Sequence, residues 1–269
     1  MICRLLAIVL CLVLPFAAQA EALRIGGTGS SEPLMRQLIA EFNKQSPEIT
    51  FTVLSPSLGS GGGLKALAGA KIDLAVIARA LTGEEKALFG RQVALGSTPF
   101  VLVTRDGQRR KGFTLNELAS VYDGRLQAWD GGAPIRLVLR TRDDSDSAQI
   151  KAMSPAMAEA VMVADQRPGM VYGDDDMDTL EILERTPGSL GPTSLGLLRT
   201  MNSRLKTLAV NGVIPSIKAM KDGSYPWRKT LTVVLPLAPS TATEKFADFL
   251  HSAKAAEVLR RYDYLPGGA

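Results

Sequence analysis

The chain has 269 residues, of which 46% are hydrophobic and 22% are charged. These values are close to the averages of globular proteins, so they exclude a disordered tail, a collagen and a coiled coil, and the length allows one or two domains. The formal net charge is only +4, and no run of five or more like charges occurs, which disfavours a nucleic-acid partner.

The first twenty residues, MICRLLAIVLCLVLPFAAQA, predict a secretory signal peptide (1–20) that is cleaved after Ala20 in a periplasmic protein. Arg4 precedes an apolar run that ends at Phe16, and Ala-Gln-Ala closes the segment. A membrane-anchoring helix is the alternative, but the run is shorter than the roughly twenty residues that span a bilayer. A lipoprotein signal is rejected because Leu10, not a small residue, precedes Cys11.

Both cysteines, Cys3 and Cys11, lie in this removable segment. The mature chain would have no thiol and a single histidine, His251, which disfavours thiol catalysis and a zinc site. We therefore expect no metal and no cofactor, and we interpret His251 as a residue on a helix surface. Loss of Arg4 leaves 30 basic and 27 acidic residues, a net charge of +3.

The elements that follow alternate between strands and helices. The apolar patterns predict strands at 23–25, 50–54, 72–77, 98–106, 134–140, 205–210 and 231–237, with a strand or turn at 169–173. Helices are expected from about 34, from 64, over 115–124, after 145–147, over 155–165 and 178–189, and in one closing helix over 241–262. This order predicts an α/β fold with largely parallel sheets.

Three Gly/Ser-rich turns, at 26–33, 58–63 and 140–147, directly precede predicted helices. A helix N-terminus offers backbone N–H groups and a partial positive charge, so such turns can bind an oxyanion. Each turn can equally be an ordinary helix cap, with Ser30 or Ser31 capping the first helix and Ser145 or Ser147 the third. None matches the P-loop or the GxGxxG pattern, which disfavours a nucleotide.

Arginines stand at the ends of two predicted strands. Arg79 ends IDLAVIAR, and Arg140 ends PIRLVLR with Arg142 close behind. Ligands of open α/β sheets bind beyond the carboxyl ends of strands, where an arginine can hold an oxyanion through two hydrogen bonds. A surface arginine at the start of a loop is the alternative for each.

The order of these segments resembles the phosphate-binding proteins of ABC importers, a family with the type II periplasmic binding-protein fold. GGTGSSEPLM and LGSGGGLKAL are similar to that family's anion loops, and FTLNELASVYDGRLQAW, NGVIPSIKAMKDGSYPWRKTLTVVLP and FADFLHSAKAAEVLRRYDYLP match its later segments. The resemblance covers nearly the whole mature chain.

The resemblance implies an α/β fold of two lobes with two crossover strands, near 100–106 and 226–233. Lobe 1 would comprise 21–103 with 228–269, and lobe 2 would comprise 104–227. A monomer would capture phosphate or a related oxyanion in the cleft and deliver it to an ABC permease, without enzyme activity. The predicted ligand-binding residues are Ser30, Ser31, Ser60, Gly61, Arg79, Arg140 or Arg142, Ser145 and Ser147.

Two departures from the family's pattern leave the anion open. Arg79 stands where these proteins commonly have an aspartate, and Ser145-Asp146-Ser147 replaces Ser-Gly-Thr. Asp144 or Asp146 could supply the missing acceptor or could be ordinary residues of a helix start. The alternatives are a binding protein for another small ligand that serves a sensor, a hydrolase, and a structural protein that has lost its ligand.

Overall fold

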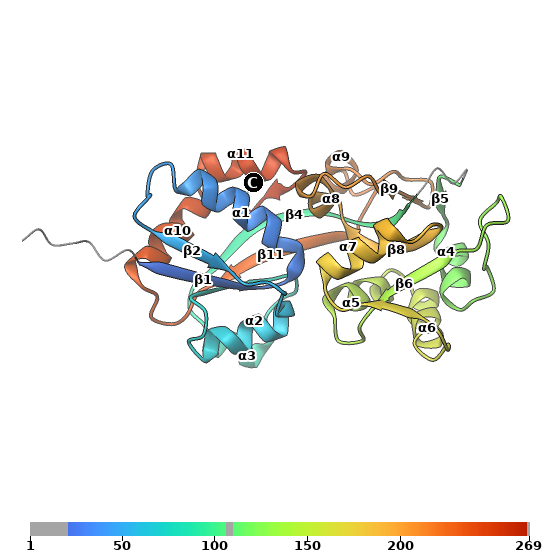
Figure 1. Cartoon of the computed structure of the whole chain (residues 1–269), viewed down its shortest axis with the longest axis horizontal. Coiled ribbons are helices and arrows are strands. Elements are labelled where there is room, and N and C mark those ends of the chain that lie inside the picture. The colour runs from blue at the N-terminus through green and yellow to red at the C-terminus, as the bar shows by residue number, and fades with distance from the viewer. Residues whose placement is uncertain (1–20, 106–109, 268–269) are drawn as a thin grey trace, which may run out of the picture.

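The computed structural model describes residues 21–105 and 110–267, so the predicted signal peptide and its cleavage site lie outside the described residues. One sheet, in the strand order β2-β1-β3-β11-β4-β8-β6-β7, runs through two groups of helices (Figure 1). We call the half built on β1 (Ala22–Gly27), β2 (Thr50–Val53) and β3 (Leu74–Ile77) lobe 1. The half built on β6 (Arg136–Arg140), β7 (Val171–Gly173) and β8 (Ser189–Ser194) is lobe 2.

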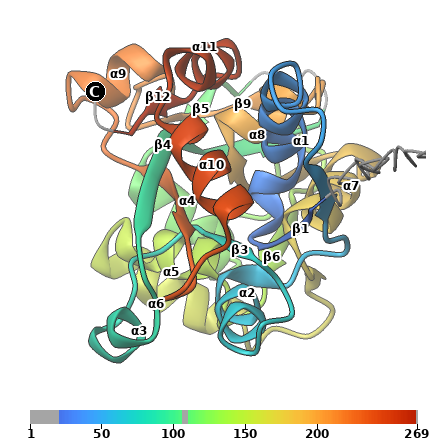
Figure 2. The ribbon, with the colours of Figure 1, turned by 90° about the vertical axis from the view of Figure 1, so that its left-hand side faces the viewer.

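Lobe 1 has helices on both faces of its strands, because successive side chains of a strand point to opposite faces. Leu74 and Val76 of β3 pack toward one group of helices, whereas Ala75 and Ile77 pack toward the other. The first group is α1 (Glu32–Phe42), α10 (Thr241–Leu250) and α11 (Ala253–Arg261); the second is α2 (Gly59–Ala68) with α3 (Gly83–Leu88) nearby. Figure 2 looks on to this lobe and shows the two groups apart.

Lobe 2 repeats the design. Leu137 and Leu139 of β6 pack against α4 (Leu115–Tyr122), α5 (Ser145–Ala152) and α6 (Pro155–Ala164), whereas Val138 faces α7 (Asp176–Arg185) and α8 (Leu195–Thr200). The remaining elements are short: η1 (Gly29–Ser31), β5 (Gly112–Phe113), β9 (Lys206–Thr207), β10 (Ala209–Val210), α9 (Ile217–Lys221) and β12 (Leu265–Pro266). The described residues thus form two helix-covered halves of one sheet.

Two antiparallel strands, β4 (Gln92–Thr104) and β11 (Arg228–Val234), lie between the lobes. Along β4, Leu95 belongs to the core of lobe 1 and Phe100 to the core of lobe 2. The chain therefore passes from one lobe to the other inside ordered strands. The exact lobe boundaries stay a prediction.

The sheet is mixed rather than largely parallel, since β11 pairs antiparallel to both β3 and β4, and β4 to β8. The predicted closing helix is in fact two helices, because the first ends at the exposed His251 and Ser252 caps the second. The second predicted helix starts at Gly59 and not at Leu64, so the glycine-rich turn is itself helical. No helix among the described residues is long and apolar enough to span a bilayer.

Candidate functional site

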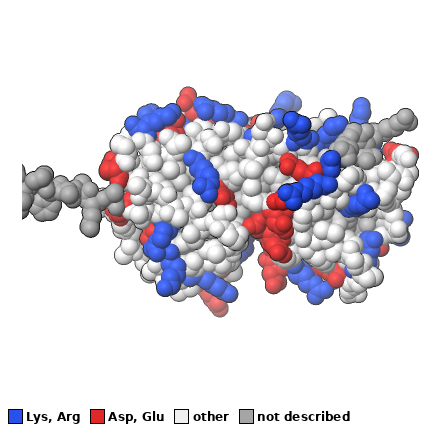
Figure 3. Space-filling view, in the orientation of Figure 1, with Lys and Arg blue, Asp and Glu red and all other residues white. Residues whose placement is uncertain are grey.

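A cavity of about 360 Å³ lies between the lobes. Lobe 1 lines it with residues 57–62 and Arg79, and lobe 2 with residues 140, 141, 143–145 and 174–176. The helices α2, α5 and α7 all begin at this cavity. Figure 3 shows acidic side chains gathered on the surface where the two lobes meet. Segments from four distant parts of the sequence therefore meet at one place.

Helix α2 presents an uncapped N-terminus to the cavity. No side chain caps its first turn, whereas Asp144 caps α5 and Asp175 caps α7. The first N–H groups of a helix have no partner within the helix, so they can bind an anion. A Cβ atom built on Gly61 would meet no atom within 4 Å, which leaves the approach to this turn open.

Ser60 joins α2 to the end of β3. Its hydroxyl oxygen accepts the backbone N–H of Ala78 at 3.0 Å, and the serine is buried. A hydroxyl that accepts one hydrogen bond keeps its own proton to donate. Ser60 can therefore stabilise the loop and donate to a ligand at the same time.

Arg79 lines the cavity but already has a carboxylate partner. Its two terminal nitrogens each lie 2.7 Å from an oxygen of Glu85, which also completes the capping box of α3. The bond from Arg79 and the backbone N–H of Thr82 lower the pKa of Glu85 to about 2. About a third of the Arg79 side chain remains exposed, so its charge still reaches the cavity.

Arg140 is the buried cation of the site, with a side chain that is 1% exposed. It donates to both oxygens of Asp144, at 3.1 and 2.7 Å, and to the hydroxyl of Thr179 at 2.6 Å. Its carbonyl oxygen accepts the hydroxyl of Ser147 at 3.0 Å. Burial alone would lower the pKa of Arg140, but Asp144 and Asp176 outweigh it and raise that pKa, so the guanidinium stays charged.

Next to Arg140 lies a buried ion cluster, which we define as Lys229, Asp146 and Asp176. The Lys229 ammonium lies 2.6 Å from Asp146 and 2.5 Å from Asp176, and all three side chains are at most 4% exposed. Lys229 belongs to the crossover strand β11, whereas the two aspartates begin α5 and α7 of lobe 2. Burial raises the pKa of Asp146 to about 6, although Lys229 opposes this shift.

The cavity brings together five of the predicted site residues: Ser60, Gly61, Arg79, Arg140 and Ser145. Ser30, Ser31, Ser147 and Arg142 do not line it. The Ser31 hydroxyl donates to the carbonyl of Thr28, and the Ser147 hydroxyl to that of Arg140. Of the two arginines left open by the sequence, Arg140 reaches the cavity, while Arg142 is 66% exposed and pairs with Asp165. Asp144, not Ser145 or Ser147, caps α5.

Sequence reasoning missed residues 174–176, which line the cavity, and it missed the buried ion cluster. The run Asp174-Asp175-Asp176 before a predicted helix was a visible signal, since acidic residues favour helix starts. Lys229 gave only a weak signal, because a lysine at the start of a strand ordinarily faces solvent. Among the described residues, no group of three or more His, Cys, Asp or Glu side chains could hold a metal ion.

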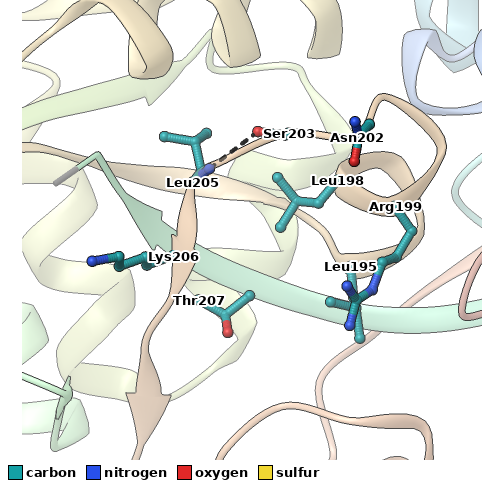
Figure 4. A pocket seen from close by; sticks show the side chains of 8 residues that line it. All are labelled: Leu195, Leu198, Arg199, Asn202, Ser203, Leu205, Lys206 and Thr207. Atoms are coloured by element: carbon teal, nitrogen blue, oxygen red, sulfur yellow. Dashed lines mark hydrogen bonds between the residues drawn. The ribbon is translucent and has the colours of Figure 1, made fainter. Parts of the chain in front are cut away.

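Another cavity, of about 320 Å³, lies beside α8 in lobe 2 (Figure 4). In it the hydroxyl of Ser203 accepts the backbone N–H of Leu205 at 3.3 Å. Arg199, at its edge, is paired with Asp263. It contains none of the predicted site residues, so the interlobe cavity is the candidate site.

Two α/β lobes, two crossover strands and a cavity between the lobes define the fold of the two-lobed periplasmic binding proteins. The fold is similar to a Clostridium perfringens protein assigned to a phosphate ABC transporter as its substrate-binding protein and solved with bound phosphate. That comparison has a TM-score of 0.78 and 19% identity, over 91% of this chain and 99% of the other. An ABC-type phosphate transport receptor from Vibrio cholerae gives a TM-score of 0.65 at 19% identity, over 90% and 99%.

A family model described as the PBP superfamily domain matches residues 15–254, and the chain belongs to this family. The chain is also 31% identical over 109 residues to phosphate-binding protein PstS 2 of Streptococcus pneumoniae. This match covers 40% of the chain and 36% of that relative, so it spans about a third of the relative's length.

Proposed function

We propose that the protein is an extracytoplasmic substrate-binding protein that captures phosphate or a related oxyanion in the interlobe cavity and delivers it to an ABC permease. The observation that carries the proposal is the uncapped, glycine-rich start of α2, which opens on the cavity opposite Arg140. The similar proteins are named as phosphate-binding proteins and as parts of ABC transporters, and these names support phosphate as the ligand and an ABC permease as the partner. On this proposal the signal peptide (1–20) exports the chain, which acts as a monomer and not as an enzyme.

The cavity offers an oxyanion three kinds of donor. The first backbone N–H groups of α2 and the hydroxyl of Ser60 come from lobe 1, and the hydroxyl of Ser145 comes from lobe 2. Arg79 and Arg140 add charge-assisted hydrogen bonds, which are about twice as strong as neutral ones. An anion held by both lobes would stabilise their closed arrangement.

The aspartates select the protonation state of that anion. Five of them line the cavity: Asp143, Asp144, Asp174, Asp175 and Asp176. A carboxylate accepts a proton that hydrogen phosphate carries and sulfate lacks, and an unmatched buried acceptor costs about 1–3 kcal/mol. We therefore propose that phosphate is preferred to sulfate.

A calorimetric titration of the purified protein with phosphate, sulfate, molybdate and a phosphonate tests this function. We expect heat with phosphate, and affinity for it roughly tenfold weaker in Arg79→Ala, because a charge-assisted hydrogen bond is lost. Arg142→Ala is the matched control, since it removes the same group outside the cavity and should leave affinity unchanged. If phosphate gives neither heat nor a thermal shift, the proposed ligand is wrong.

A second candidate function is the binding of a different small ligand for a sensor. The observation that favours it is the excess of carboxylates, because five aspartates and two arginines line the cavity. Such a lining suits a ligand that carries a cationic group beside its anionic one. An aminoalkylphosphonate that binds more tightly than phosphate in the same titration would support this candidate.

A further inference from the structure

Asp176 of lobe 2 makes polar contacts with the first glycine-rich loop of lobe 1. One oxygen of its carboxylate accepts the hydroxyl of Thr28 at 3.3 Å. Although burial alone would raise the pKa of this carboxylate, Lys229, Arg140 and the nearby backbone N–H of Ser30 together lower that pKa, so the group is an anion. The other oxygen lies 2.5 Å from the ammonium of Lys229 on the crossover strand. Each of these groups is at least nine-tenths buried.

These contacts are the ones that an oxyanion would make in the same place. Thr28 precedes the short helix η1, which leads directly into α1, and no side chain caps the start of either helix. A hydroxyl, a backbone N–H and an ammonium are the donors that bind phosphate oxygens elsewhere in proteins. Here the acceptor that they surround is a carboxylate of the chain itself.

The residue before Asp176 adds a second link between the lobes. One oxygen of Asp175 accepts the backbone N–H of Ser57 in lobe 1 at 3.1 Å, and the other caps α7. The first turn of α7 therefore contacts lobe 1 at two places, on the loops before α1 and before α2. Both contacts are made by groups of the chain itself.

We infer that Asp176 is an internal anion that occupies the Thr28–Ser30 loop, holds the two lobes together, and competes for that loop with an oxyanion that reaches it from the cavity, which Asp176 also lines. The competition rests on the proposed function, whereas the role in holding the lobes together does not. Because part of the binding free energy is spent on displacing Asp176, the apparent affinity is lower than the intrinsic one.

Small-angle X-ray scattering with and without inorganic phosphate tests the link between the lobes. We expect the radius of gyration of the wild-type protein to stay the same when phosphate is added, because the lobes are already together. Asp176→Asn removes the internal anion. Its radius of gyration should therefore be larger than that of the wild type without phosphate, and should decrease when phosphate is added. Asp174→Asn removes one negative charge from the same cavity without touching the Thr28–Ser30 loop, so it should scatter like the wild type.

Calorimetry on the same three proteins tests the competition. We expect Asp176→Asn to bind phosphate about tenfold more tightly than Asp174→Asn. Both variants remove one negative charge from the cavity, but only Asp176→Asn also frees the Thr28–Ser30 loop. Equal affinity in the two variants, or weaker binding by Asp176→Asn, would overturn the competition.

The two readouts separate this inference from the proposed function. A wild-type protein that contracts when phosphate is added, or an Asp176→Asn variant that scatters like the wild type without phosphate, would overturn the link. If no variant binds phosphate, the proposed function fails, while the scattering without phosphate still decides whether Asp176 holds the lobes together. The wild-type measurement needs no variant, so it remains informative if Asp176→Asn folds poorly.

Discussion

Asp146 shows how burial makes one residue respond to pH near neutrality. Its carboxylate is buried and faces Lys229, Asp176, Asp144 and Arg140. Burial raises its pKa from 3.8 to about 6, and the two neighbouring carboxylates act in the same direction, while the two cations oppose it. The folded state therefore holds a proton on this group at pH values where the unfolded chain has released it.

This shift has a definite sign for stability. Because the pKa is higher in the folded state, the contribution is fully present below about pH 4 and is lost as pH rises through about 6. We expect the melting temperature of the wild-type protein to fall from pH 5 to pH 7 more steeply than that of Asp146→Asn, which has no group to titrate there. Thermal unfolding at pH 5, 6 and 7 measures both slopes, and parallel profiles would contradict this assignment.

The candidate site was predictable where a residue type and its local position define its role. Arg140 at a strand end and Ser60 in the glycine-rich segment lie at the cavity, as the sequence pattern indicated, although Ser60 is already inside α2. Lys229 was not predictable, because its burial depends on Asp146 and Asp176, which are remote in the sequence and reach it only in the folded chain. All the predicted contacts with a ligand, those of Arg140 and Ser60 included, stay predictions.

Helix α2 illustrates the difference between a predicted and an observed element. Its first turn contains Gly59, Gly61 and Gly62, which are poor helix formers, so the sequence predicted a turn there. Gly63 explains the packing: a Cβ at this position would lie 2.7 Å from the Cα of Gly27 in β1. The glycine lets the helix lie directly on the strand, which sets the uncapped end at the cavity.

This packing gives a stability prediction for one helix. Gly63→Ala should destabilise the protein by about 1–3 kcal/mol, because overpacking must move the backbone of α2 or β1. Gly61→Ala is the control, since its Cβ meets no atom within 4 Å and should not destabilise. Chemical denaturation of the two variants measures the difference. Equal stability of both variants would show that the contact is relieved at no cost.

Other elements were predictable where the order of hydrophobic and polar residues along the sequence follows the period of a strand or a helix. The strand β3 is an apolar run with four buried residues, and it was predicted. The strand β8, SLGPTS, is equally buried but consists mostly of small and polar residues, so no hydrophobic pattern predicted it. The break between α10 and α11 depends on one cap, Ser252, inside an otherwise continuous helical pattern.

At the scale of the whole molecule, one sheet carries both lobes and places the candidate site between them. The strand–helix alternation and the family resemblance predicted this α/β fold, and the match of the family model confirms the resemblance. The antiparallel crossovers explain why the chain has no linker rich in Pro, Gly or Ser, since β4 and β11 connect the lobes as ordered strands.

The central claim is that an oxyanion binds in the interlobe cavity at the start of α2. A crystal structure of the protein grown with phosphate tests it most directly. We expect tetrahedral density within hydrogen-bond distance of the backbone N–H groups of Ser60 and Gly61 and of the Arg140 guanidinium. The account would be contradicted by a cavity without such density in a crystal grown at a phosphate concentration that calorimetry in solution shows to be saturating.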